Sequence, residues 1–68
     1  MIYWYAIQHG RNHNDIRYGF TNKRLAIQKA NEMVRDIRFD GEEIRIAVCD
    51  ATDGFVLNEI IVREGWNN

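Results

Sequence analysis

His9, His13 and Asp15 lie within seven residues near the amino terminus, in the run "HGRNHND". Imidazole and carboxylate groups are zinc ligands, so a metal site is the first chemistry to consider. A spacing of four aligns two imidazoles only on a helix. Residues 9–15 are instead rich in Gly, Asn and Asp, a composition typical of a loop. We therefore expect exposed loop histidines and no metal.

Few other side chains suggest catalysis. Cys49 is the only cysteine and falls in an alternating apolar run, where a structural thiol is expected rather than a nucleophile. Asp15 and Asp40 have no spacing that implies a pair for acid–base work. No phosphate-binding loop, nucleophile elbow or metalloprotease motif is present in the sequence. The sequence thus predicts no catalytic residue, no cofactor and no enzyme activity.

Four basic residues suggest an anion site. Lys23 and Arg24 fall in the first turn of a predicted helix, where acidic residues are preferred because of the helix dipole. With Arg11 and Arg17 they could gather around free backbone N–H groups and bind a phosphate or carboxylate. The alternative is that these side chains are solvated, with their stems covering neighbouring aromatic rings. Both interpretations stay open at this point.

The clearest element is an amphipathic helix over residues 21–38. Thr21 fits as its N-cap. Phe20 and Leu25 then have the spacing of a hydrophobic staple, and Asp40–Gly41 would end the helix and turn the chain. Its apolar stripe consists of Ala26, Ile27, Ala30, Met33, Val34 and Ile37.

Four other segments have the composition of strands. Residues 2–8 are apolar at both parities, which favours a central strand covered on both sides, and residues 16–20 alternate. Residues 42–50 and 55–63 form a predicted hairpin around Gly54, which takes a positive φ. The order strand, strand, helix, strand, strand predicts an α+β two-layer sandwich, with one helix packed on a four-stranded antiparallel sheet.

One helix covers one face of such a sheet. Either Ile2, Trp4 and Ala6 or Tyr3, Tyr5 and Ile7 then point away from it, and we expect the uncovered face to be apolar. Exposed apolar faces are more often interfaces than bare surface. We also expect a bulge or an edge position in the last strand, at the polar pair Asn58 and Glu59. The predicted partner-binding residues are Tyr3, Trp4, Tyr5 and Trp66.

Length and composition limit the classes of function. The 68 residues predict one domain over 1–68, with a small core that self-association would help to stabilise. The lone thiol and the lack of a signal peptide indicate the cytoplasm, and "MIYWYAI" is too short to span a bilayer. Residues 1–38 carry seven basic and three acidic side chains, against two and seven in 39–68. The sequence pI of about 6.0 disfavours nucleic-acid binding.

Resemblances to three kinds of protein bear on function. The run "YGFTNKRLAIQKANEM", about a quarter of the chain, resembles the sheet-to-helix passage of HicB-type antitoxin domains, although their usual Gly/Pro pattern before the helix is absent. In size and layout the chain is similar to small phage-encoded inhibitors of bacterial defence, anti-CRISPR proteins among them, which share no motif that maps residue by residue. Dodecin-type flavin binders are similar in length but lack the strand "IRYGF".

These observations predict a small non-enzymatic protein-binding module. We expect it to act as a homodimer or on another protein, as an inhibitor of the anti-CRISPR kind or as a regulator, with a HicB-type antitoxin-like regulator as a further reading. Trp, Tyr and Arg, the residue types most often found as interface hot spots, are frequent in this chain. The alternative is a nucleic-acid or anion-binding protein that uses the basic loop and the helix N-terminus.

Overall fold

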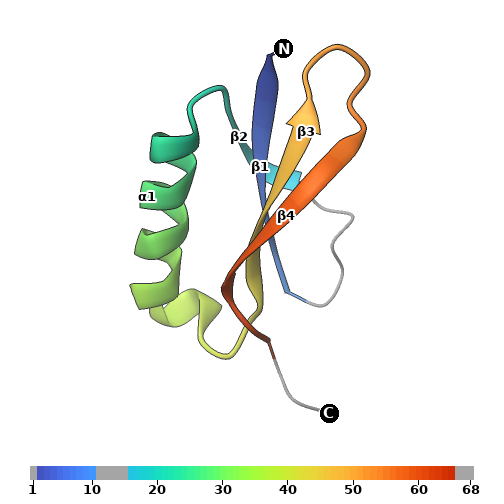
Figure 1. Ribbon diagram of the computed structural model, residues 1–68. Coiled ribbons are helices and arrows are strands. Elements are labelled where there is room, and N and C mark those ends of the chain that lie inside the picture. The colour runs from blue at the N-terminus through green and yellow to red at the C-terminus, as the bar shows by residue number, and fades with distance from the viewer. Residues whose placement is uncertain (1, 11–15, 66–68) are drawn as a thin grey trace.

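The computed structural model describes residues 2–10 and 16–65, and of residues 16–18 the backbone alone. One helix packs against a four-stranded antiparallel sheet with the strand order β2-β1-β3-β4, so the predicted α+β class is confirmed (Figure 1). The elements are β1 (Tyr3–His9), β2 (Ile16–Phe20), α1 (Lys23–Arg35), a 3-10 helix η1 (Ile37–Phe39), β3 (Ile44–Asp50) and β4 (Val56–Arg63).

β1 lies in the middle of the sheet, between β2 and β3. Its Ile7 is opposite Tyr18 of β2 and Ile46 of β3, and its Ala6 is opposite Ala47. Ile7 packs on the helix side and Ala6 on the far side, and neither is accessible to solvent. The prediction of a central strand covered on both sides is confirmed.

The main core lies between α1 and the sheet. Two alanines of the helix, Ala26 and Ala30, are fully buried and allow the helix backbone to approach the strands closely. Met33 fills the space beside them, against Ile44 and Ile46 of β3. The half-buried rim of this core consists of Tyr5, Phe20, Ile27, Val34, Phe39, Ile60 and Val62. The predicted apolar stripe is thus confirmed as far as Val34.

The helix begins one residue later than predicted. Asn22 is the N-cap, because its side-chain oxygen accepts hydrogen bonds from the backbone N–H groups of Arg24 (2.8 Å) and Leu25 (3.4 Å). Asn is at least as good a cap as Thr, so the predicted cap at Thr21 is wrong. Leu25 then sits at the third helical position and is half exposed, and the predicted staple with Phe20 is wrong in register.

The helix also ends earlier than predicted, at Arg35. Asp36 has extended backbone angles, and its carboxylate accepts the backbone N–H of Arg38 (2.9 Å) and pairs with the Arg38 guanidinium (2.6 Å). This local bonding competes with the helical hydrogen bonds and starts η1 instead. Ile37, which was predicted to lie on the stripe, is 86% exposed. The turn at Gly41 is confirmed by its φ of 79°.

The sheet face away from the helix differs from the expected exposed apolar surface. At its centre Ala6, Ala47 and Cys49 are only 0–3% exposed, and Trp4 packs against them. The indole also lies directly over Gly19, where an added Cβ would be 2.3 Å from Trp4 Cζ2. The expectation is wrong for this centre because β1 and β3 place small residues there, against which Trp4 packs.

Two groups of contacts, made by Arg63 and by His9, join the sheet to the segment that follows α1. Arg63 donates to the carbonyls of Glu42 (3.0 Å), Val34 (3.1 Å) and Phe39, which joins β4 to the end of α1 and to η1. His9 Nδ1 lies 2.7 Å from Glu42 Oε1, and its ring meets Phe39 edge-on at 5.0 Å. His9 is therefore a half-buried strand residue, and the prediction that it is an exposed loop histidine is wrong. His13 lies outside the described residues.

Candidate functional site

Three segments meet at one end of the molecule: the start of β1, the first turn of α1 and the β3–β4 hairpin (Figure 1). The N–H of Ala51 donates to the carbonyl of Ile2 (3.0 Å), and the N–H of Asp50 donates to the carbonyl of Phe55 (2.9 Å). Gly54 takes a φ of 79° in the hairpin turn, as the sequence predicted. These bonds hold the first residues of β1 beside the hairpin.

Large apolar side chains are exposed at this end. Five neighbouring residues there are between 40% and 71% exposed, and we call them the hairpin patch: Ile2, Tyr3, Phe55, Val56 and Leu57. The patch extends from the start of β1 to the start of β4, which is an edge strand. Groups of exposed apolar side chains at one end of a molecule mark contact sites in folded proteins, whereas single exposed apolar side chains are normal.

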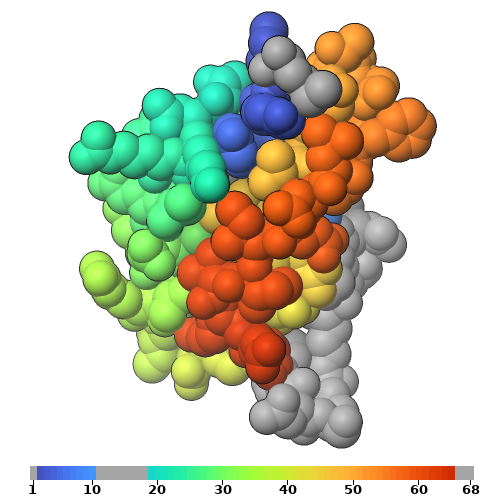
Figure 2. Space-filling view, viewed as in Figure 1, coloured from blue at the N-terminus to red at the C-terminus, as the bar shows by residue number. Residues whose placement is uncertain are grey.

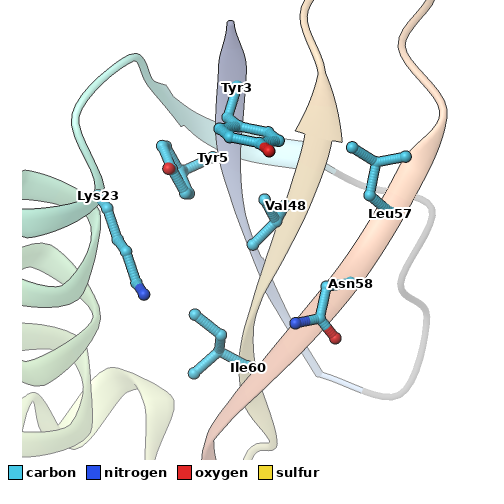
Figure 3. A pocket seen from close by; sticks show the side chains of 7 residues that line it. All are labelled: Tyr3, Tyr5, Lys23, Val48, Leu57, Asn58 and Ile60. Atoms are coloured by element: carbon cyan, nitrogen blue, oxygen red, sulfur yellow. The ribbon is translucent and has the colours of Figure 1, made fainter. Parts of the chain in front are cut away.

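A hollow of about 320 Å³ adjoins the patch on the helix side of the sheet. In Figure 2 its floor is visible where side chains of β1 (blue) and β3 (yellow) appear between the green helix and the orange β4. The sheet extends past the first turn of α1, so the helix leaves this part of the sheet uncovered (Figure 1). The lining residues, drawn in Figure 3, are Tyr3, Tyr5, Lys23, Val48, Leu57, Asn58 and Ile60.

A bulge in β4 brings Leu57 into the hollow. Val48 is opposite Asn58 and Cys49 is opposite Val56, so Leu57 is an extra residue with no opposite partner on β3. Bulges re-aim side chains in this way and often lie at sheet edges. The predicted bulge or edge position next to Asn58 is confirmed, since β4 is both bulged and at the edge.

The polar groups of the hollow can donate hydrogen bonds to a ligand. In the described part of the chain, the Lys23 ammonium and the Tyr3 and Tyr5 hydroxyls make no hydrogen bond or ion pair. The Asn58 side-chain oxygen accepts the N–H of Glu59 (2.9 Å), which leaves its NH₂ group for a ligand. Figure 3 shows Lys23 extending from the helix on the side opposite Leu57 and Asn58. The lining contains no acidic side chain.

The predicted partner-binding residues are divided among different places. Tyr3 and Tyr5 both line the hollow, whereas Trp4 packs on the opposite sheet face. Trp66 lies outside the described residues. Leu57 and Ile60 also line the hollow, but the sequence analysis did not select them as site residues. The polar pair Asn58 and Glu59 indicated an irregularity in this part of β4, and the bulge there places Leu57 in the hollow.

The predicted anion-binding residues lie partly outside the described structure. Lys23 lines the hollow, but Arg24 lines a separate groove on the outer side of α1 with Gln28, Glu32 and others. Arg11 lies outside the described residues, as does the side chain of Arg17. A nucleic-acid surface built on these four residues therefore stays a prediction.

Electrostatic contacts elsewhere stabilise the sheet margin. Arg45 lies between Glu43 (2.9 Å) and Glu59 (2.8 Å), and hydrogen bonding, to Glu43 above all, raises the pKa of its guanidinium.

Burial raises the pKa of the Cys49 thiol, which disfavours the nucleophilic thiolate. Over residues 2–10 and 16–65, no group of three His, Cys, Asp or Glu side chains is placed to hold a metal ion.

No family model matches this chain, and neither curated proteins nor solved structures give a match. The likeness to HicB-type domains and to small phage-encoded inhibitors therefore remains a resemblance of one short run and of layout. Among the described residues, no helix is long and apolar enough to cross a membrane. The candidate site consists of an apolar patch at one end of the molecule and, beside it, a hollow lined by hydrogen-bond donors.

Proposed function

We propose that this protein is a non-enzymatic protein-binding module that contacts another protein through the hairpin patch and the hollow beside it. The observation that carries the proposal is the grouping of five large apolar side chains, each at least 40% exposed, at one end of the molecule. A chain with so small a core gains stability by burying such side chains, and leaving them in water forgoes about 25 cal/mol per Å² of apolar surface.

The composition of this surface supports contact with a protein. Specific interfaces combine an apolar centre with a polar rim, and tyrosine is enriched among the residues that dominate their energy. The hairpin patch supplies Phe55, Val56 and Leu57. The hollow adds Tyr3 and Tyr5, together with other hydrogen-bond donors. In this proposal the protein inhibits or regulates its partner by occupying part of the partner's surface.

A matched pair of double variants tests the proposal. F55S/L57S removes two exposed apolar side chains from the patch, and I37S/I61S removes two that are exposed outside it. Each tagged protein is expressed in the cells that naturally make it, and retained proteins are quantified by mass spectrometry, with sedimentation to measure self-association.

We expect wild type and I37S/I61S to retain the same partner, and F55S/L57S to lose it by tenfold or more. Loss of about 1.4 kcal/mol of binding free energy gives that factor. Concentration-dependent self-association that only F55S/L57S abolishes would identify the partner as a second copy. Equal retention by all three proteins, with no difference in sedimentation, would refute the proposal.

A further inference from the structure

We propose that the hollow beside α1 binds a carboxylate that is carried next to a bulky apolar side chain, on an acidic segment of the partner protein. This inference rests on the proposed function and specifies the chemistry of the partner. It follows from the size of the hollow, from its polar groups and from the charge of the adjacent helix turn.

The size and shape of the hollow suit a peptide side chain. At about 320 Å³ it lies at the lower limit of the range for small-molecule pockets, and it is open to solvent on one side (Figure 2). Val48, Leu57 and Ile60 supply apolar surface. One large apolar side chain with a neighbouring polar group would fill such a space. A cofactor that has to be buried would not be enclosed by it.

The polar groups of the hollow select for an anion. Lys23 supplies a positive charge, and the Asn58 NH₂ group and the hydroxyls of Tyr3 and Tyr5 supply further donors. A carboxylate can accept a hydrogen bond from any one of these groups, and hydrogen bonds to an ionised acceptor are about twice as strong as neutral ones. A cationic side chain would instead meet the like charge of Lys23 with no acid in the lining to offset it.

The first turn of α1 adds to this charge bias. It contains Lys23 and no acidic residue, although the positive end of a helix dipole favours acidic side chains. A carboxylate from the partner, bound beside Lys23, would supply the negative charge that the helix itself lacks. Binding of such a carboxylate would explain why the first turn of α1 contains no acidic residue of its own.

Titration of the ¹⁵N-labelled full chain with short peptides tests the inference. The probe is acetyl-Glu-Phe-amide, and the matched peptide is acetyl-Gln-Phe-amide, which keeps the shape and loses the charge. We expect the Glu peptide to shift the amide resonances of Tyr5, Lys23, Val48 and Leu57, and to bind about three- to tenfold more tightly than the Gln peptide. K23Q should remove this preference, and R24Q should keep it.

Three results would overturn the inference: no shifts at the hollow with the Glu peptide, equal affinity for both peptides, or an unchanged preference in K23Q. Tighter binding of 3-phenylpropanoate than of the Glu peptide would also overturn it, because a small carboxylic acid would then be the better ligand. The proposed function fails separately. If F55S/L57S loses the partner while K23Q retains it fully, protein binding stands and the acidic-segment inference alone is wrong.

Discussion

Trp4 lies over Gly19 on the sheet face away from the helix. A methyl group at position 19 would lie 2.3 Å from the indole, so G19A must displace the ring or shift β2 away from β1. Overpacking of this kind costs about 1–3 kcal/mol. We expect that loss in the free energy of unfolding, measured by urea denaturation, together with a red shift of tryptophan fluorescence.

The same substitution in a W4L background isolates the contact. With the indole removed, we expect G19A to cost less than half of its value in the wild type, since the two changes are coupled only through the ring. Additive costs in the two backgrounds would show that Trp4 does not cover Gly19.

Cys49 is a second residue whose environment makes a prediction. It is 3% exposed, and burial raises the pKa of its thiol, so both access and thiolate population are low in the native protein. Alkylation by iodoacetamide at pH 8 should be slower by at least about tenfold in the native protein than in 6 M guanidinium. Mass spectrometry over time measures both rates, and equal rates would contradict the burial of Cys49.

The end of α1 depends on Asp36. Hydrogen bonds from Arg38 lower the pKa of this carboxyl from 3.8 to about 2. A carboxyl with a depressed folded pKa stabilises the native state above its unfolded pKa, and this contribution is lost as pH falls through the folded value. D36N should therefore be less stable than wild type at pH 5, and the difference should shrink between pH 4 and pH 2.

Urea denaturation of both proteins at several pH values measures this difference. D36N replaces the carboxylate with an amide of the same size, so packing around η1 is retained. A difference that stays constant from pH 5 to pH 2 would show that the Asp36–Arg38 pair does not stabilise this end of the helix.

β4 is joined to the helix end by Arg63, which donates to the carbonyls of Glu42, Val34 and Phe39. R63A removes all three bonds from half-buried carbonyls, and we expect a loss of about 2 kcal/mol in the free energy of unfolding. R24A serves as the control, because that side chain is exposed on the helix and should cost less than about 0.5 kcal/mol. Similar stabilities for R63A and R24A would contradict this role of Arg63.

The order of the elements could be predicted from periodicity, and their ends could not. The helical stripe from Ala26 to Val34 and the alternation within β3 both reflect burial on one side, which the sequence pattern records directly. The end at Arg35 depends instead on whether the Asp36 carboxylate bonds locally, and the start depends on a choice between two good caps, Thr21 and Asn22.

On the scale of the whole molecule, the site could be predicted only in part. Tyr3, Tyr5 and Lys23 were selected from the sequence for other reasons, as members of an exposed face or of a basic cluster. These three residues line one hollow because of where the helix begins relative to the strands and because of the bulge at Leu57. Both features depend on how the elements pack, which the sequence pattern does not record. Five of the eight large apolar side chains that are exposed in the described part of the chain lie in the hairpin patch.

The central claim is that this end of the molecule contacts a protein partner. Photo-crosslinking tests it most directly, with p-benzoylphenylalanine placed at position 57 in the patch or at position 28 on the outer side of α1, in the cells that make the protein. We predict a discrete cross-linked product of defined mass from position 57 and none from position 28. Equal cross-linking from the two positions, or none from position 57, would contradict the claim.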